Sequence, residues 1–564
     1  MKEYITKEIK SVLSEFDDVP ADFEIELEKP QNASHGDLSS NAAMKLARYL
    51  RRAPRSIAED LAERLREKPV DATRISGIEV AGPGFLNFRF ASDYLTDALA
   101  DILSAGDNYG RSEIGKGQTA IVEYVSANPT GPLTVGHGRN AVLGDTLANL
   151  LDWLGYDVTR EYYFNNAGRQ MRVLGQSVRG RYRALVNKDE PTKKIEVSEG
   201  NEVEVPVSFP DDGYLGGYIK DIAATLVEEH GDALYDQEDE TVFKDAAEKA
   251  IFKDIEATLL RLNIKMDTFF NEHSLYESGR VWDVVETFRE KDLAYDADGA
   301  TWFKTTEFGK DKDKVLVKST GEPTYSLPDI AYHADKFDRG FSKIVDIFGA
   351  DHIATYPDVL SGVKVLGYDT SKVDVVIYQF VTLVRGGVQV KMSTRKATYE
   401  TLDDLMDEVG DDVTRFFFLM RSPNTHLEFD LDLAKQAREK NPVFYLQYAH
   451  ARICSIIRKA QEVGFDFENE TDLTLLVHDT EKELIKQLLM LPGVIEGAAN
   501  AKEPHRLIYY LNEVATRFTK FYDACRIVGE EPTLASARMK LADAARTVLR
   551  NGLTILGISA PERM

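Results

Sequence analysis

The sequence predicts a multidomain α/β protein, with a doubly wound parallel sheet at its centre, an α+β domain before it and an all-α bundle after it. A chain of 564 residues is too long for one compact core and suggests three or four domains. In the middle of the chain, strand-like apolar runs alternate with stretches of helical periodicity, which is typical of parallel sheets. After about residue 412 the strand-like runs nearly vanish, and apolar residues recur at helical spacing.

The composition predicts a cytoplasmic protein that does not enter membranes. Hydrophobic residues make up 43% and charged residues 29% of the chain, as in ordinary globular domains. The longest apolar runs are far shorter than the ~20 residues of a membrane helix, and residues 1–16 lack the apolar core of a signal peptide. Cys454 and Cys525 are the only cysteines, so a disulfide framework is excluded and we expect no structural metal.

The formal net charge of −25 disfavours general attraction to nucleic acid, and we expect no binding to DNA. Two windows without acidic residues nevertheless carry clusters of basic residues. These are Lys45, Arg48, Arg51, Arg52 and Arg55 in the first window, and Arg169, Arg172, Arg179, Arg181, Arg183 and Lys188 in the second. Each window is either a local basic surface or an ordinary solvated helix face, and both interpretations stay open.

Residues 1–105 are expected to form the α+β domain, and the glycine-rich stretch Ala105–Gly117 to link it to the rest of the chain. The expected elements are a helix near 3–16, a helix near 40–67, and strands at Ile75–Val80 and Phe85–Phe90 on either side of the turn Gly82-Pro83-Gly84.

The parallel sheet is expected within residues 106–411. A strand at Thr119–Val125, a helix from about His137 to Leu154 and a strand at Val158–Phe164 form a β-turn-α-β unit, which opens a doubly wound sheet. A long insertion follows at about 165–275. The strands expected to complete the parallel sheet are Val315–Lys318, Lys343–Phe348 and Val373–Phe380, with a helix near 353–366. Residues 412–564 are expected to form the helical bundle.

The strongest motif lies where the first strand turns into the first helix. It reads Ser126-Ala-Asn-Pro-Thr-Gly-Pro-Leu-Thr-Val-Gly-His137-Gly-Arg139-Asn140. Open α/β sheets bind ligands at the carboxyl ends of their strands, and a helix N-terminus favours phosphate. Gly136 and Gly138 would let a nucleotide approach the backbone, and His137 is a hydrogen-bond donor. The alternative is a helix-capping loop with an incidental histidine.

A second motif, Lys391-Met-Ser-Thr-Arg395-Lys396, follows the glycine-rich turn Arg385-Gly386-Gly387 after a late strand. Cations beside a nucleotide site can neutralise charge that develops on a leaving pyrophosphate. Alone, the motif is equally compatible with a solvated basic loop. A competing phosphate loop at Gly110–Lys116 is rejected, because Gly117 stands where a Ser or Thr is required and the stretch precedes a strand.

In this order, the two motifs resemble the HIGH and KMSKS signatures of class I aminoacyl-tRNA synthetases. Four stretches resemble the arginyl family in particular. They are Glu123–Asp145, which includes the first motif, the helical Tyr445–Arg452, and two stretches near the start, His35-Gly36-Asp37 and Gly82–Asn87. The resemblance implies a Rossmann-like catalytic domain, an N-terminal domain that meets the tRNA elbow, and a C-terminal anticodon-binding domain. Two positions depart from the signatures, because Thr134 replaces the first His and Thr394 replaces the second Lys.

The resemblance also implies the reaction. ATP, with Mg²⁺, would activate L-arginine to arginyl-adenylate, and the arginyl group would pass to the terminal ribose of tRNA(Arg), with release of AMP and pyrophosphate. The family is among the few synthetases that need bound tRNA before they activate the amino acid. We expect a monomer. Two alternatives stay open, namely another class I synthetase and a catalytically silent paralogue that binds tRNA or senses an amino acid.

Residue roles are carried over only where residues match the family motifs. The catalytic residues would be His137, Lys391 and Lys396, the last as a substitute for the missing signature lysine. ATP would be bound by Thr134, Gly136, His137, Lys391 and Ser393. Arginine would be bound by Glu123, Asn128, Tyr325, Asp329 and Asp351, since a guanidinium calls for carboxylate partners. The tRNA would be contacted by Phe85, Asn87, Tyr445 and Tyr448. The alternatives are a packed aromatic residue for Tyr325, a helix cap for Asp329, and core packing for the two C-terminal tyrosines, for which we favour the tRNA contact.

Overall fold

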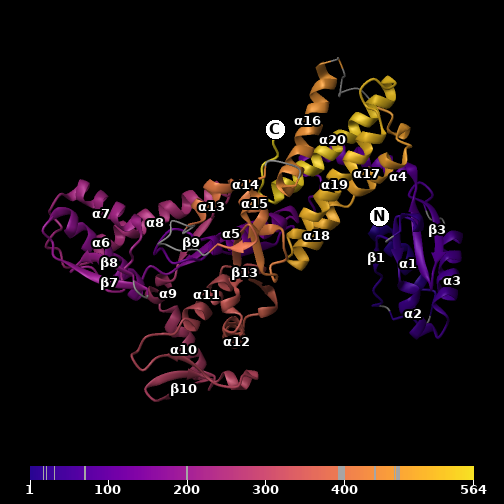
Figure 1. Ribbon diagram of the computed structural model, residues 1–564. Helices are drawn as coiled ribbons and strands as arrows, with labels where there is room; N and C mark the ends of the chain where they lie inside the picture. Colours follow the sequence, from indigo (N-terminus) through magenta and orange to yellow (C-terminus); the bar gives the residue numbers. More distant parts are fainter. Residues whose placement is uncertain are drawn as a thin grey trace.

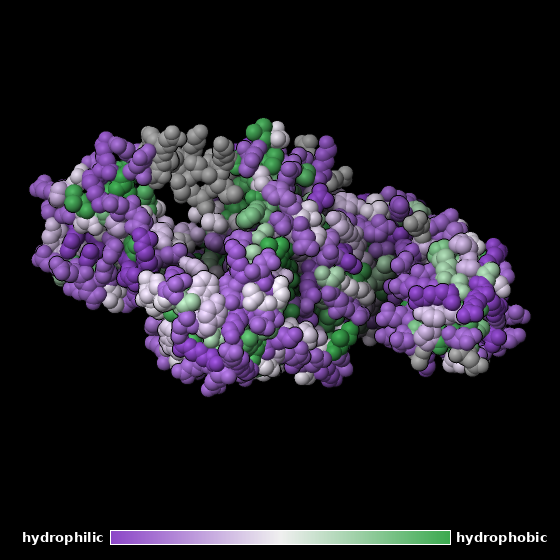
Figure 2. All heavy atoms as spheres, turned by 90° about the horizontal axis from the view of Figure 1, so that it is seen from below, coloured by the Kyte–Doolittle hydropathy of each residue, from purple (hydrophilic) through white to green (hydrophobic). Residues whose placement is uncertain are grey.

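The computed structural model describes the whole chain except residues 17, 21, 31, 69–70, 199–200, 391–400, 437–439, 463 and 465–470. The molecule is elongated (Figure 1), with the N-terminal domain at one end, the α6–α8 insertion at the other, and the parallel sheet and C-terminal helices between them. The face seen in Figure 2 is mostly hydrophilic, and its apolar side chains lie in small scattered groups.

The N-terminal domain is a four-stranded antiparallel sheet of order β1-β2-β4-β3, packed against three helices. Its strands are β1 (Leu27–Glu28), β2 (Leu38–Ser40), β3 (Ile75–Ala81) and β4 (Phe85–Phe90), and its helices are α1 (Lys2–Leu13), α2 (Ala42–Leu50) and α3 (Pro54–Glu67). The single helix predicted near 40–67 is thus two helices. Arg51 adopts a left-handed conformation that ends α2, and Pro54 starts α3 at a position where its missing N–H costs nothing.

The central sheet has five parallel strands in the order β14-β13-β5-β6-β9. Its strands are β5 (Thr119–Glu123), β6 (Asp157–Phe164), β9 (Thr268–Asn271), β13 (Lys343–Gly349) and β14 (Val373–Tyr378). The strand order reverses between β5 and β13, which is the switch point where doubly wound sheets bind ligands. The fold class predicted from the sequence is confirmed.

One strand prediction was wrong, and one strand was missed. Val315–Lys318 corresponds to β12 (Lys314–Val317), which lies in a separate antiparallel sheet with β10 (Ala294–Ala297) and β11 (Ala300–Phe303). Asp298 and Gly299, both at positive φ, form the two-residue turn that closes β10 on β11, so this region pairs locally. The fifth parallel strand is β9, at the end of the stretch interpreted as an insertion.

The insertion folds as three helices packed on one another, with a β-hairpin beside the first of them. Its elements are α6 (Gly168–Val186), β7 (Thr192–Ser198), β8 (Asn201–Pro206), α7 (Gly217–His230) and α8 (Thr241–Arg261). Several arginines of the second basic window are used in packing: Arg179 and Arg183 donate to the carbonyls of Glu238 and Tyr235, and Arg181 stacks on the Phe209 ring. Only part of that window is therefore an open basic surface.

Helices cover the central sheet and continue into the C-terminal bundle (Figure 1). Around the sheet lie α5 (Val135–Trp153), α9 (His273–Glu277), α10 (Arg280–Glu290), α11 (Ser326–Asp338) and α12 (Tyr356–Leu366), whereas α4 (Ser92–Ala105) packs against helices of the C-terminal bundle. A small sheet of order β16-β15-β17 follows, built from β15 (Val381–Arg385), β16 (Val388–Gln389) and β17 (Leu427–Asp430). The remaining helices are α13 (Leu402–Val409), α14 (Asp411–Leu419), α15 (Leu431–Ala434), α16 (Pro442–Glu462), α17 (Asp479–Leu488), α18 (Leu491–Ala501), α19 (His505–Ala524) and α20 (Pro532–Ile555).

The C-terminal bundle is attached directly to the region of the central parallel sheet. Arg415 of α14 is fully buried, pairs with Asp145 of α5, and donates to the carbonyls of Leu262 and Leu556. Asn149 of α5 donates to the Ile555 carbonyl at the end of α20. One buried guanidinium thus joins the insertion, helix α5 and the bundle.

Candidate active site

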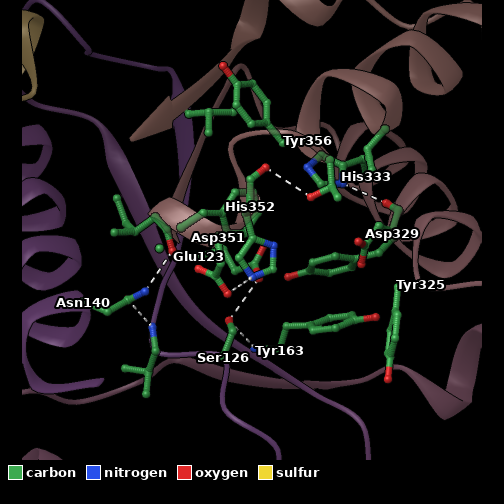
Figure 3. A pocket seen from close by; sticks show the side chains of 18 of the residues that line it. Glu123, Ser126, Asn140, Tyr163, Tyr325, Asp329, His333, Asp351, His352 and Tyr356 are labelled. Carbon is green, nitrogen blue, oxygen red and sulfur yellow. Dashed lines mark hydrogen bonds and ion pairs between the residues drawn. The ribbon is translucent and has the colours of Figure 1, made fainter. Parts of the chain in front are cut away.

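A cavity of about 480 Å³ lies at the carboxyl ends of β5 and β13, next to the N-terminus of α5 (Figure 3). Six residues singled out in the sequence line it together: Glu123, Asn128, His137, Tyr325, Asp329 and Asp351. They come from distant parts of the chain, and the parallel sheet brings them to one edge. The cavity is rich in carboxylates and aromatic rings.

The end of β5 is bent sharply into the cavity. Val125 and Ser126 both have positive φ, 68° and 46°, which is an uncommon conformation for non-glycine residues and a strained one for a β-branched valine. Asn140 of α5 holds this bend: its Oδ1 accepts from the Val125 N–H at 2.6 Å, and its Nδ2 donates to the Ile347 carbonyl of β13 at 2.9 Å. The motif residue Asn140 therefore ties the two central strands at the switch point.

Glu123 lines the floor of the cavity and is already paired with a buried lysine. Its Oε2 lies 2.6 Å from Nζ of Lys336, and its Oε1 accepts from the Ser126 hydroxyl at 3.0 Å. Lys336 also lies 2.6 Å from Oδ1 of Asp346, whose other oxygen is 3.0 Å from Nε2 of His333. These four ionisable groups are buried, and the acids hold the pKa of Lys336 above its ordinary value despite the burial.

Asp329 lies on the wall of the cavity without a partner for its carboxylate. His333 Nδ1 is 2.8 Å from the backbone carbonyl of Asp329, but within the described part of the chain no donor or cation contacts the carboxylate oxygens. Burial raises the pKa of Asp329 to about 7. The side chain is therefore suited to receive a cationic ligand, because an incoming positive charge would stabilise the ionised form.

Sequence reasoning missed one acid of this cavity, Glu272, which lines it together with Glu123, Asp329 and Asp351. Glu272 is buried, and its two oxygens accept from the Tyr163 hydroxyl at 2.5 Å and the Asn165 amide at 2.7 Å. These donors are neutral, and burial raises the pKa of Glu272. Glu272 follows directly after β9, the missed strand. Had β9 been recognised, the acid at its carboxyl end would have been a candidate.

His137 is held at the N-terminus of α5 in a defined orientation. The backbone N–H of Thr134 donates to His137 Nδ1 at 3.1 Å, and the Thr134 hydroxyl lies 3.3 Å from the same nitrogen. Burial lowers the pKa of His137, so the ring is neutral and carries its proton on Nε2. Gly136 lies in the same first helical turn. The turn therefore offers a ring N–H together with helix N–H groups, which suits an anionic ligand.

The remaining predicted residues lie at the rim. Tyr325 is 85% exposed at the start of α11 and is not part of the core. Asn128 is also exposed, and it accepts from the N–H of Asn165 and donates to Gln170. Asp351 lies at the end of β13 beside His352, whose ring stacks on Phe348. The rim is thus polar and aromatic.

Lys391, Ser393, Thr394 and Lys396 lie outside the described residues, but both flanks of the 391–400 stretch are described. Val390 donates to the carbonyl of Leu383 in β15. On the other side, Leu402 at the start of α13 donates to the Leu133 carbonyl, one residue before Thr134, at 2.7 Å. The C-terminal flank of the second motif is therefore bound directly to the first motif.

Comparison with known proteins decides the family. The family model for the catalytic domain of class I tRNA synthetases (R) matches residues 98–420, that for the arginyl tRNA synthetase N terminal domain matches 2–90, and that for the DALR anticodon binding domain matches 446–564. An arginine–tRNA ligase of Salinibacter ruber is 63% identical over 564 residues, which span all of both chains. The chain belongs to the arginyl-tRNA synthetase family.

Other members and a solved structure agree with this assignment. The arginine–tRNA ligase of Desulfotalea psychrophila is 50% identical and covers 95% of this chain and 94% of its own. The structure of Thermus thermophilus arginyl-tRNA synthetase superposes over 100% of both chains with a TM-score of 0.76 at 21% identity, which shows a shared fold. Family membership confirms the predicted class of enzyme, a class I arginine–tRNA ligase.

The residues predicted to contact tRNA lie in the two outer domains of this arginyl-tRNA synthetase architecture. Phe85, 38% exposed, and the buried Asn87 line a cavity of the N-terminal domain together with Asn41. Among the residues that the structure describes, no hydrogen-bond partner reaches the buried amide oxygens of Asn41 and Asn87. In the bundle, Tyr448 is 40% exposed and stacks on Phe444, whereas Tyr445 is half-buried.

Among the described residues, no helix is both long and apolar enough to span a bilayer.

Proposed function

We propose that this protein uses ATP to activate L-arginine and then transfers the arginyl group to the 3′-terminal ribose of tRNA(Arg). A carboxylate oxygen of arginine attacks the α-phosphorus of ATP, the bond to the bridging oxygen breaks, and pyrophosphate leaves. A terminal ribose hydroxyl then attacks the carbonyl carbon of arginyl-adenylate, loses its proton, and displaces AMP. Both steps rest on positioning and charge stabilisation rather than on a covalent enzyme intermediate.

The observation that carries the proposal is the charge pattern of the cavity. Glu123 is already paired with Lys336, so the lining acids without a lysine or arginine partner among the described residues are Asp329, Glu272 and Asp351. A guanidinium presents five donors in one plane and binds carboxylates in pairs. An uncharged amino acid would leave the carboxylates of Asp329 and Glu272 buried and unpaired, which costs a few kcal/mol. This difference supports selection of arginine over other amino acids.

The first turn of α5 supports an ATP site next to this cavity. The Nε2–H of His137 and the N–H groups around Gly136 are suited to the phosphates, and Thr134 orients the histidine ring. We propose that Lys391, Ser393 and Lys396 of the neighbouring stretch supply further contacts, and that Mg²⁺ enters with ATP as part of the substrate. Cations there would offset charge that develops on pyrophosphate.

The two outer domains support a tRNA contact at two places. We propose that Phe85 and Asn87 meet the elbow, where the unpartnered amide oxygens would accept from a base. We further propose that Tyr448 stacks on an unpaired anticodon base, with Tyr445 beside it. The exposed ring of Tyr448 supports this role over core packing. With the net charge of −25, such local contacts are needed, because the protein as a whole repels RNA.

Pyrophosphate exchange, measured with each amino acid in the presence and absence of tRNA(Arg), tests the proposal. Exchange that needs arginine is the expected result. Exchange with a different amino acid would favour another class I specificity. Binding of tRNA or arginine without any exchange would favour a catalytically silent paralogue.

A further inference from the structure

Arg139 is a buried cation without a carboxylate partner in the described part of the chain. It belongs to the first motif, two residues after His137, and its side chain is fully buried. Its guanidinium contacts backbone carbonyls only: Nη1 donates to Gln379, and Nη2 donates to Ser422 at 3.1 Å and Thr425 at 3.0 Å. Burial lowers the pKa of Arg139 to about 10. Burying a charge without an oppositely charged partner costs free energy of folding. The role of Arg139 therefore lies in the geometry of its contacts.

The three carbonyls mark the beginning of the small β16-β15-β17 sheet. Gln379 lies between β14 and β15, and its N–H donates to the Pro423 carbonyl at 3.0 Å. Ser422 and Thr425 lie in the turn that leads into β17, which pairs in parallel with β15 from Val381↔Leu427 onward. Arg139 therefore joins α5 to the point where both strands of this pair begin.

A second set of contacts joins the first turn of α5 to α13 and α14, the helices that follow the second motif. A side chain at Gly138 would come within 2.6 Å of Leu402 and 2.9 Å of Phe418, so α13 and α14 pack tightly against the first turn of α5. The Leu402 N–H also donates to the Leu133 carbonyl. The strand β16 of the small sheet ends at Gln389, Val390 still donates to the Leu383 carbonyl of β15, and α13 begins at Leu402. Both described flanks of the second motif are thus fixed to the helix that carries His137.

We propose that Arg139 is a positioning residue for adenylate formation: it holds the small sheet β16-β15-β17 at a fixed distance from the N-terminal turn of α5. This inference rests on the proposed function and extends it to a residue that touches no substrate. These contacts require a guanidinium, because its two separate terminal nitrogens, Nη1 and Nη2, reach three carbonyls in different directions. A lysine offers a single point charge and cannot make all three contacts.

The test compares Arg139→Lys and Arg139→Met with the wild-type protein in pyrophosphate exchange with arginine, ATP and tRNA(Arg). Methionine removes the buried charge, so Arg139→Met is expected to fold even where the lysine variant does not. We expect kcat to fall by roughly 10²-fold in both variants, with the KM for arginine and the affinity for tRNA changed by less than about threefold. Arg111→Lys is the matched control: Arg111 contacts the other end of α5, at the Asp152 carbonyl, and its variant should keep the wild-type kcat.

A double-mutant cycle separates positioning from general stability. If Arg139 acts through the small sheet and the second motif that follows it, Arg139→Met should cost little further kcat in a Lys391→Ala background. Additive losses, wild-type kcat in both Arg139 variants, or failure of both to fold would each overturn the positioning role. If wild-type protein shows no arginine-dependent exchange, the proposed function fails instead, and the two failures are thereby distinguished.

Discussion

The Nζ atom of Lys336 lies 2.6 Å from Oε2 of Glu123, beneath the cavity in which arginine is proposed to bind. Lys336 has no exposed surface, and it also contacts Asp346. Lys336 therefore has a clear structural role: it places one positive charge between two buried carboxylates, Glu123 and Asp346, at the cavity floor. The selection of a cationic ligand is left to Asp329, Glu272 and Asp351.

Removal of the lysine should destabilise the fold. In Lys336→Met, Glu123 and Asp346 stay buried without their cation, and we expect a loss of about 3–5 kcal/mol in the free energy of unfolding. Urea unfolding at pH 7 measures this loss. Lys304→Met, which breaks the ion pair with the exposed Asp292, is the control and should change stability by less than about 1 kcal/mol. Equal effects of the two variants would contradict the structural role.

Asp329→Asn should weaken arginine binding by roughly 10²-fold, because a guanidinium loses its charged acceptor while the cavity keeps its shape. ATP binding should be unchanged. Equilibrium dialysis with each ligand gives both affinities. Asp338→Asn, at the other end of α11, pairs with Arg280 away from the cavity and serves as the control. Unaltered arginine affinity in Asp329→Asn would remove Asp329 from the binding site.

Arginine affinity should depend on pH through the same residue. Because burial raises the pKa of Asp329 to about 7, this carboxyl is increasingly protonated below pH 7 in the free protein. A guanidinium binds the ionised form and must displace that proton, so the Kd for arginine should rise by up to about tenfold per pH unit below pH 7 and level off above it. The dependence should become much weaker in Asp329→Asn, in which Glu272 is left as a lining acid whose pKa burial raises. A flat profile in the wild-type protein would contradict the raised pKa.

His137→Ala should lower adenylate formation by roughly 10²-fold, the usual cost of losing one donor to developing charge. Thr134→Ala should have a much smaller effect, since the N–H that orients the ring belongs to the backbone and survives the substitution. Single-turnover formation of arginyl-adenylate compares the two variants. A larger loss in Thr134→Ala than in His137→Ala would mean that the hydroxyl, rather than the ring, binds phosphate.

Tyr448→Ala should weaken tRNA(Arg) binding by about 1–3 kcal/mol, the scale of one lost base stack. The exposed ring predicts that the melting temperature stays near that of the wild-type protein. Filter binding at fixed salt measures the affinity, and Tyr295→Ala, an exposed tyrosine in β10, is the control. A variant that melts early, or one that binds tRNA normally, would instead favour a packing role.

The sequence predicted the parts of the site that depend on local pattern. The strand, turn and helix around His137 were predictable because their signals lie within one short stretch of chain. Lys336 was not, because its partner Glu123 lies 213 residues away and nothing local marks a lysine as buried. Glu272 escaped for a related reason: β9 has only four residues, and its place in the sheet is set by pairing with β6.

The buried guanidinium of Arg415 has a consequence for the order in which the molecule matures. Arg415 leaves the ribosome long before Leu556, whose carbonyl it binds, and until then that contact must be made by water. In the same way, the side-chain amide of Asn149 in α5 finds its acceptor, the Ile555 carbonyl, only after residue 555 has been synthesised. The packing of α5 and α14 is therefore completed only when the last turn of α20 has folded. A nascent chain that ends before residue 556 should be recognised by chaperones and proteases and should not yet work as a catalytic domain.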